Sequence, residues 1–269
     1  MTICKTRGLA IRKLDYSETS QIVTFLTEGY GKTKTIAKGI KRPKSRLGGA
    51  VDLLADCEVV FLEKPGGDLH ILTECEATSI FAGLREDPER AEAAFAAADL
   101  LDRFVYPGER GKECYQLSVE LLGALDRGEE RAEILFLAFV ARLLKIHGLL
   151  PLVGHCVACR EARPARESMF SSRLGGLLCK RCLANDPYAF KTTAGSVALL
   201  AALAKPDRLP RRRLRMSETD LRNLWVLVAR YLAFVLDGLP DIVERLRRRM
   251  CKQPDSAGVG QRIRSGASA

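Results

Sequence analysis

The sequence has few of the residues on which most catalytic sites depend. Only three histidines, His70, His147 and His155, occur among the 269 residues. No G-x-S-x-G motif is present, and no recognisable carboxylate arrangement for metal-dependent cleavage occurs. Gly31-Lys-Thr33 resembles the end of a P-loop, but Leu26 stands where the motif requires a glycine. We therefore expect no catalytic residues and predict that the protein is not an enzyme.

Segments for export or for spanning a membrane are also missing. The first residues lack the apolar stretch of a secretory signal. The most apolar region, Ile134–Val153, is interrupted by Arg142, Lys145 and His147, which indicates a buried helix rather than a membrane span. Nine cysteines, an odd number without an export signal, argue against a disulfide framework. A cytoplasmic protein without membrane contact is expected.

Basic residues are in excess, and they are unevenly distributed. The formal net charge is +10 at pH 7. Residues 1–80 contain 12 Lys/Arg and 10 Asp/Glu, residues 81–150 contain 9 and 13, and residues 151–269 contain 22 and 10. The excess favours a polyanionic partner, with nucleic acid ahead of a membrane surface. Solubility alone is the alternative explanation of the charge.

The first 80 residues have the pattern of a small β-barrel. Five short runs rich in Ile, Val, Thr, Phe and Leu are separated by turn signals such as Pro65-Gly-Gly-Asp68. In the last run, alternation places Leu69, Ile71, Thr73 and Cys75 on one face. Five strands suit an OB barrel, and an SH3-like barrel is the main alternative. The expected strands are 8–14, 21–27, 32–38, 55–63 and 69–76.

From residue 85 onward the apolar residues recur with helical spacing. Asp87-Pro88 is a helix start, and Ser217-Glu-Thr-Asp220 has the form of a capping box. The segment after Cys251 is polar and rich in Gly and Ser, without periodicity, and is predicted to be disordered. The expected helices cover about 88–105, 113–126, 130–147, 193–204 and 217–237.

Two C-x2-C motifs are the strongest chemical signal. Cys156 and Cys159 form the first pair, Cys179 and Cys182 form the second, and nineteen residues separate them. Two such pairs supply the four corners of a tetrahedron and leave no open position, so they predict one structural zinc ion. Four core cysteines without metal are the alternative. His155 adjoins the first motif, but four cysteines already complete the ligand shell.

The spacing excludes one catalytic zinc class and predicts a local fold. Zinc deaminases need H-x-E ahead of P-C-x-x-C, and this sequence contains no H-x-E. Between the two cysteine pairs, Met169-Phe170 and Leu174-Gly-Gly-Leu177 predict a small hairpin beneath the metal.

The segment Lys32–Arg46 contains seven basic residues and no acidic ones. In a strand, Lys32, Lys34 and Lys38 project from the same face, and the stretch up to Gly49 forms a basic loop beside it. On a small barrel this arrangement suits a phosphate backbone, and a solvated surface loop is the alternative. The predicted nucleic-acid-binding residues are Lys32, Lys34, Lys38, Lys41, Arg42, Lys44 and Arg46.

Other residues could extend this surface. Basic clusters occur at 205–215 and at 245–249, where charged helix ends or loops are the alternative. Tyr16 and Tyr30 could stack on bases, whereas Phe25 and Phe61 lie in apolar runs and are assigned to the core.

In their order and spacing these motifs resemble the RecO family of DNA recombination and repair mediators. The stretch 8–23 resembles the family's opening strand pair, and 27–46 resembles its basic strand and loop. Leu143–Pro151, followed by the first cysteine pair, is similar to the segment that leads into its zinc knuckle. The resemblance covers about residues 3–240. Family members differ in whether they keep the four cysteines, and the family has no catalytic residue to transfer.

The resemblance implies a multi-domain α+β fold. An N-terminal five-stranded OB-type β-barrel is followed by an α-helical domain with an inserted Cys4 zinc module. The expected division is 1–80 for the DNA-binding barrel, 81–152 and 187–250 for the two parts of the helical domain, 153–186 for the zinc module, and 251–269 for the disordered tail.

The implied activity is binding of single- and double-stranded DNA and annealing of complementary strands. With RecR, such a protein displaces single-strand-binding protein so that RecA can load, in the cytoplasm and in association with the nucleoid. One alternative is a zinc-ribbon transcription or RNA-binding protein without annealing activity. Another is an adaptor whose helical domain contacts proteins while it touches DNA weakly.

Overall fold

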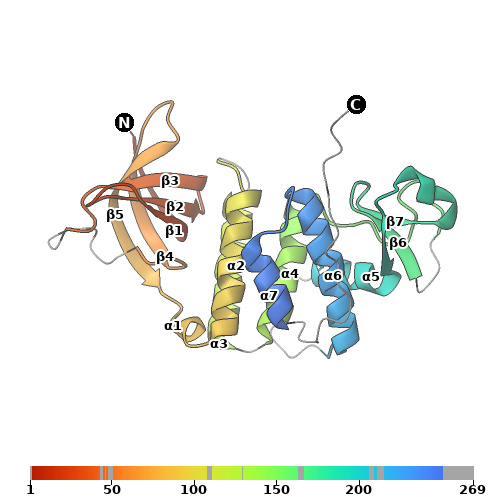
Figure 1. Ribbon diagram of the computed structural model, residues 1–269. Helices are drawn as coiled ribbons and strands as arrows, with labels where there is room; N and C mark the ends of the chain where they lie inside the picture. Colours follow the sequence, from red (N-terminus) through yellow and green to blue (C-terminus); the bar gives the residue numbers. More distant parts are fainter. Residues whose placement is uncertain are drawn as a thin grey trace, which may run out of the picture.

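The computed structural model describes residues 2–42, 45, 47, 51–107, 111–128, 130–162, 167–205, 209–210 and 215–250. A β-barrel, a group of helices and a small three-stranded sheet follow one another along the molecule (Figure 1). The barrel and the small sheet lie at opposite ends, with the helices between them. This arrangement confirms the predicted α+β fold. The predicted tail, 251–269, lies outside the described residues.

The N-terminal strands form a closed barrel in the order β1-β2-β3-β5-β4. β4 pairs back onto β1, which closes the sheet. β3 and β5 are parallel, whereas the other neighbouring strands are antiparallel. This five-stranded order is that of the OB type rather than of an SH3-like barrel. The strands are β1 (Thr2–Asp15), β2 (Gln21–Thr27), β3 (Gly31–Ala37), β4 (Asp56–Glu63) and β5 (Leu69–Ser79).

Two barrel strands differ from the expectation. β1 begins at Thr2 rather than at Gly8, because its first half pairs with β4 and its second half with β2. The prediction that Leu69, Ile71, Thr73 and Cys75 share one face of β5 is wrong. A bulge in β5 opposite Val60 and Phe61 changes the alternation of its side chains. Leu72 therefore enters the core at 3% exposure, whereas Thr73 is exposed and its hydroxyl donates to the Val60 carbonyl.

The helices pack around one strongly apolar element, α4, which is buried over most of its length. Phe136 of α4 stacks on Trp225 of α6 with a centroid distance of 5.6 Å. As predicted, Asp87 caps α2 and Ser217 caps α6 by accepting backbone N–H bonds. The sequence did not predict α1 or α7. The helices are α1 (Ala82–Arg85), α2 (Pro88–Phe104), α3 (Gly111–Arg127), α4 (Ala132–Ile146), α5 (Ala194–Leu203), α6 (Glu218–Val235) and α7 (Asp241–Met250). Each helix in the described part of the chain is too short or too polar to cross a membrane.

The barrel joins the helices through a buried carboxylate. Asp56 of β4 is 1% exposed, and the Tyr115 hydroxyl of α3 donates to its Oδ1 at 2.6 Å. Arg7 of β1 forms an ion pair with the same carboxylate. Burial, together with the hydrogen bond to Asp56, raises the pKa of Tyr115. The phenol therefore stays protonated and donates to the carboxylate.

A close backbone approach lies beside this network. Gly31 opens β3 with a positive φ of 65°, and Gly111 opens α3. A Cβ atom at Gly111 would lie 2.5 Å from the Cα and N atoms of Gly31. No side chain fits at Gly111 unless the barrel and α3 move apart.

The small sheet has the order β7-β6-β8, and it contains the predicted hairpin. Its inner side chains, Phe170, Leu177 and Phe190, belong to the same apolar cluster as the helices. Phe170 also meets Tyr231 of α6 edge to face at 5.4 Å. The elements are β6 (Glu167–Ser171), β7 (Gly176–Leu178), the 3-10 helix η1 (Lys180–Asn185) and β8 (Phe190–Thr193).

Candidate metal centre and nucleic-acid interface

The two cysteine pairs meet on the small sheet. Cys156 and Cys159 lie on the turn before β6, whereas Cys179 follows β7 and Cys182 lies in η1. The four Sγ atoms lie within 4.8 Å of one another. Each pair is part of a closed turn, because the Arg160 N–H donates to the Cys156 carbonyl at 2.8 Å and the Cys182 N–H to the Cys179 carbonyl at 3.0 Å. The four side chains can therefore hold one metal ion.

The sulfur geometry fits a tetrahedral ion. A Zn–S bond of about 2.3 Å places tetrahedral sulfurs about 3.8 Å apart. The Sγ atoms of Cys159 and Cys179 are 3.8 Å apart. Among the described residues, His155 is not part of this group, and its backbone pairs with Ala162.

The thiols differ in how readily they ionise. Burial opposes the thiolate of Cys156, but the backbone N–H groups of Cys159, Cys179 and Ala158 outweigh it and lower its pKa to about 6. Hydrogen bonding with Cys179 raises the pKa of Cys182 to about 12. Four neighbouring thiolates repel one another, so a cation is needed to hold all of them ionised.

Part of the predicted basic surface lies open on the barrel. Lys34 is exposed in the middle of β3, and Lys38 and Arg42 are exposed just after it. The Arg42 side chain lies against Gly39, whose positive φ of 69° turns the chain after β3. Lys41 Nζ is 2.8 Å from Asp15, so this lysine is anchored to the β1–β2 turn. Lys44 and Arg46 lie outside the described residues.

Lys32 lies in a different place from the other lysines of this segment. Its amino group donates to the backbone carbonyl of Asp102 in α2 and lies 3.4 Å from the Asp102 carboxylate. The Lys32 side chain is only 12% exposed. It contributes to the joint between the barrel and the helices.

The aromatic residues divide as expected from their neighbours. Phe25 and Phe61 are buried in the barrel core. Tyr30 is partly exposed and contacts the Phe61 ring edge to face. Tyr16 is 62% exposed on the β1–β2 turn, one residue from the Asp15 that holds Lys41. Tyr16 is therefore an exposed ring next to the residue that anchors the basic segment.

The C-terminal arginines are mostly engaged in ion pairs. Arg247 and Arg248 of α7 pair with Glu244, and Arg249 pairs with Glu92 of α2. The cluster at 211–213 lies outside the described residues.

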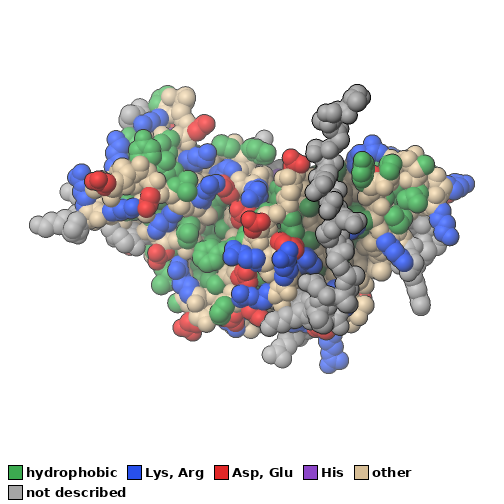
Figure 2. Space-filling view, viewed as in Figure 1, with side chains coloured by type: hydrophobic (Ala, Val, Ile, Leu, Met, Phe, Trp, Pro, Cys, Tyr) green, Lys and Arg blue, Asp and Glu red, His purple; other side chains and the backbone are tan. Residues whose placement is uncertain are grey.

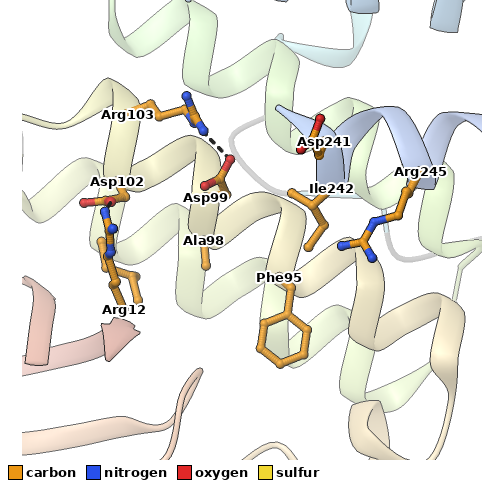
Figure 3. Close-up of a pocket in the computed structure, with 10 residues that line it drawn as sticks. Arg12, Phe95, Ala98, Asp99, Asp102, Arg103, Asp241, Ile242 and Arg245 are labelled. Carbon is orange, nitrogen blue, oxygen red and sulfur yellow. Dashed lines mark hydrogen bonds and ion pairs between the residues drawn. The ribbon is translucent and has the colours of Figure 1, made fainter. Parts of the chain in front are cut away.

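A cleft of about 650 Å³ lies between α2, α7 and the barrel (Figure 3). Its charges are balanced: Arg12 binds Asp102 and Arg103 binds Asp99, both at 2.9 Å. Asp241 and Arg245 line the α7 side. This mixture of carboxylates and guanidinium groups is a poor match for a polyanion.

Comparison with known proteins agrees with this architecture. A family model described as "Recombination protein O N terminal" matches residues 1–81, and one described as "Recombination protein O C terminal" matches residues 85–241. The DNA repair protein RecO of Moorella thermoacetica is 30% identical over 246 residues, which cover 91% of this chain and 88% of the relative. The RecO of Rhodopirellula baltica is 32% identical over 205 residues, or 76% of each chain. That of Roseiflexus sp. is 29% identical over 260 residues, or 96% and 90% of the two chains.

These matches cover the barrel, the helices and the small sheet in their order along the chain. They confirm the family to which the sequence motifs pointed, and the chain belongs to the RecO family of DNA repair proteins.

Proposed function

We propose that this protein is a mediator of recombinational DNA repair that works without catalysis. It binds single- and double-stranded DNA, anneals complementary strands and, with RecR, helps RecA to load onto DNA coated with single-strand-binding protein. The cytoplasm, next to the nucleoid, is its proposed location. The observation that carries the proposal is the exposed basic face on an OB-type barrel in a member of a DNA repair family.

The barrel is the proposed primary DNA site. Lys34, Lys38 and Arg42 present positive charge on and just after one strand, and the ion pair with Asp15 holds Lys41 in the same region. Such cations bind the phosphate backbone without reading bases, and Tyr16 supplies a ring on which a base can stack. The proposed binding residues are Lys34, Lys38, Lys41, Arg42, Lys44 and Arg46; Lys32 supports the barrel from the joint with α2.

One zinc ion is the proposed cofactor. Cys156, Cys159, Cys179 and Cys182 would complete its tetrahedral shell, so the ion has no open position for a substrate. Its role is to fix the two cysteine turns against the small sheet.

Annealing of complementary oligonucleotides tests the proposal. The protein should accelerate pairing of bare strands and of strands coated with the cognate single-strand-binding protein, and the rate should not change when ATP is added. Dependence on ATP, or cleavage of the strands, would contradict a role without catalysis. Tight DNA binding without faster annealing would favour the transcription-factor alternative.

A charge variant tests the barrel site itself. Neutralising Lys38, Lys41 and Arg42 together should weaken single-strand binding on the order of 100-fold at 0.1 M salt and lower the salt slope by about 2. The loss should be similar for different sequences, because phosphate contacts carry no base information. Neutralising Lys5, Lys64 and Lys112 removes the same net charge and is the matched control. Equal losses in the two variants would mean that net charge alone, rather than this face, binds DNA.

A further inference from the structure

We infer that the zinc-module end carries a second single-strand site, centred on Tyr188. This inference rests on the proposed function, because it assigns the other of the two strands that annealing must bring together. The site consists of Tyr188 and the flanking Arg173 and Arg230, which we call the module face.

Tyr188 is the most exposed large apolar side chain in the described part of the protein, at 92%. It is nevertheless held on an ordered loop between η1 and β8. Its backbone N–H donates to Oδ1 of Asp186 at 3.1 Å, and Oδ2 of this buried carboxylate accepts from the Ser171 hydroxyl at 2.6 Å. The backbone that carries the ring is thus held in place, and the exposed ring is open to stacking on a base.

Arginines from two other elements flank this loop. Arg173, on the β6–β7 turn, donates to the backbone carbonyl of Asn185, three residues before Tyr188. Arg230 of α6 lies 4.8 Å over the Phe190 ring, two residues after Tyr188. Both arginines are exposed. The loop therefore carries an exposed ring and has one arginine at each of its two ends, which together offer contacts to a base and to its neighbouring phosphates.

Two carboxylates near the module face are already engaged. Residues 153–193 contain seven Lys/Arg and three Asp/Glu. Asp186 is buried and hydrogen-bonded, and Glu161 pairs with Arg181 near the thiols of Cys159 and Cys179. Arg181 therefore offsets charge at the metal centre, whereas Arg173 and Arg230 lie at the two ends of the loop of Tyr188. Figure 2 shows Lys and Arg side chains along the outer edge of this end of the molecule.

The position of the module face determines what it can do. It lies at the end opposite to the barrel, with the helices between them (Figure 1). Two separated sites can each hold one strand, and this raises the local concentration of one strand near the other. Two strands on adjoining sites would instead repel each other through their phosphates.

An indole introduced by Tyr188→Trp reports the contact directly. The single native Trp225 is fully buried, so the Tyr188→Trp chain has one exposed indole. Titration of the full-length, zinc-containing protein with an oligothymidylate should quench the emission of this exposed indole by stacking. Ile80→Trp, at another exposed position, is the matched control and should respond less. Unchanged emission of the Tyr188→Trp chain, with binding verified by anisotropy of labelled oligothymidylate, would overturn the inference.

The same titration in a Tyr188→Trp chain with Lys38→Glu and Arg42→Glu separates the two sites. Quenching should persist although the barrel site is disabled. If the barrel changes abolish binding and the introduced indole never responds, only the module face is wrong. If the introduced indole is quenched and the barrel changes have no effect, the barrel site is wrong and the module face stands. If the native chain binds no oligonucleotide at all, both proposals fail.

Annealing then tests the role of the ring. Tyr188→Ala should weaken the module site roughly five- to 150-fold, the range for loss of one base–aromatic stack. The annealing rate should fall accordingly, while tight binding through the barrel changes less than twofold. Tyr188→Phe keeps the ring and should anneal at nearly the native rate. A native rate for Tyr188→Ala would contradict the role of Tyr188 in pairing.

Discussion

The barrel and the small sheet at the other end are both built from short strands, yet different forces hold them together. The barrel closes on itself and encloses its own apolar cluster, which includes Phe25, Val59 and Phe61. The small sheet has three short strands, and its apolar side chains belong to the core of the helices. So small a unit needs another stabilising element, and the metal site proposed for the four cysteines would supply one.

The two ends also differ in how they join the helices. The small sheet packs through rings such as Phe170 and Tyr231. The barrel also packs on the helices through apolar side chains, namely Leu9, Ile11, Leu26 and Leu54. To these it adds two polar contacts, Asp56 with Tyr115 and Lys32 with Asp102. Apolar packing tolerates small shifts, whereas hydrogen bonds to a buried carboxylate depend on position.

Loss of the proposed zinc ion should have the largest effect on stability. That effect should be confined to the small-sheet end of the molecule. Cys179→Ser removes one thiolate ligand, and structural zinc sites typically supply about 10 kcal/mol or more of local folding free energy. We expect the native protein to contain one zinc per chain. In the variant, proteases should cut readily within residues 153–193, and the barrel should stay folded. Metal analysis combined with mass spectrometry of the cleavage products measures both.

Cys251→Ser is the control for that experiment, because Cys251 belongs to neither C-x2-C pair. It should leave zinc content and protease resistance unchanged. Unfolding of the barrel together with the zinc module would contradict the independence of the two ends.

Tyrosine hydroxyls allow the two joints to be compared with the same substitution. Tyr115→Phe leaves the buried Asp56 carboxylate without one donor and should cost about 1–3 kcal/mol. Tyr231→Phe, on the module side, removes a bond of 2.8 Å to the neutral carbonyl of Leu149 and should cost about 1 kcal/mol. Urea unfolding of both variants measures the difference. Equal costs would mean that the barrel joint is no more dependent on its polar contacts than the module joint.

Acid should cause the smallest loss of stability, and it should act through α7 on the barrel side of the helices. Hydrogen bonds from Arg247 and Arg248 lower the pKa of Glu244 in α7 to about 2, and α7 packs on α2. Because this folded-state pKa is depressed, the stabilisation is present above the ordinary value of 4.5 and is lost as the pH falls towards 2. Solvent screening limits it to about 1 kcal/mol or less. Glu244→Gln should flatten the pH dependence of stability in this window, and an unchanged profile would contradict this assignment.

Much of the fold could be predicted because periodicity and turn residues act locally. The capping residues Asp87 and Ser217 begin helices as expected, and the spacing of the cysteines predicted their convergence. The β5 bulge was missed because it depends on the partner strand rather than on the alternation within β5. Alternation along β3 places Lys32 and Lys34 on the same face. The different position of Lys32 could not be predicted, because it depends on the packing of α2 against the barrel.

The module face was missed for a related reason. Arg173, Tyr188 and Arg230 come from a turn, a loop and a helix, and no spacing relates them. The available signal was an aromatic residue in a turn sequence, Asn185-Asp-Pro-Tyr188, within a stretch rich in arginine. α7 was not predicted, because a short run rich in arginine fits a charged helix end or a loop as well as a helix.

The contact between Gly31 and Gly111 has a mechanical consequence. Backbone rests on backbone there, so this one contact has no side chain that could change rotamer and let the barrel tilt. Motion of the barrel against α3 would have to break the hydrogen bond from Tyr115 to Asp56 as well. The molecule should therefore behave as a stiff spacer between its two ends, and any strands that it brings together must supply the flexibility themselves.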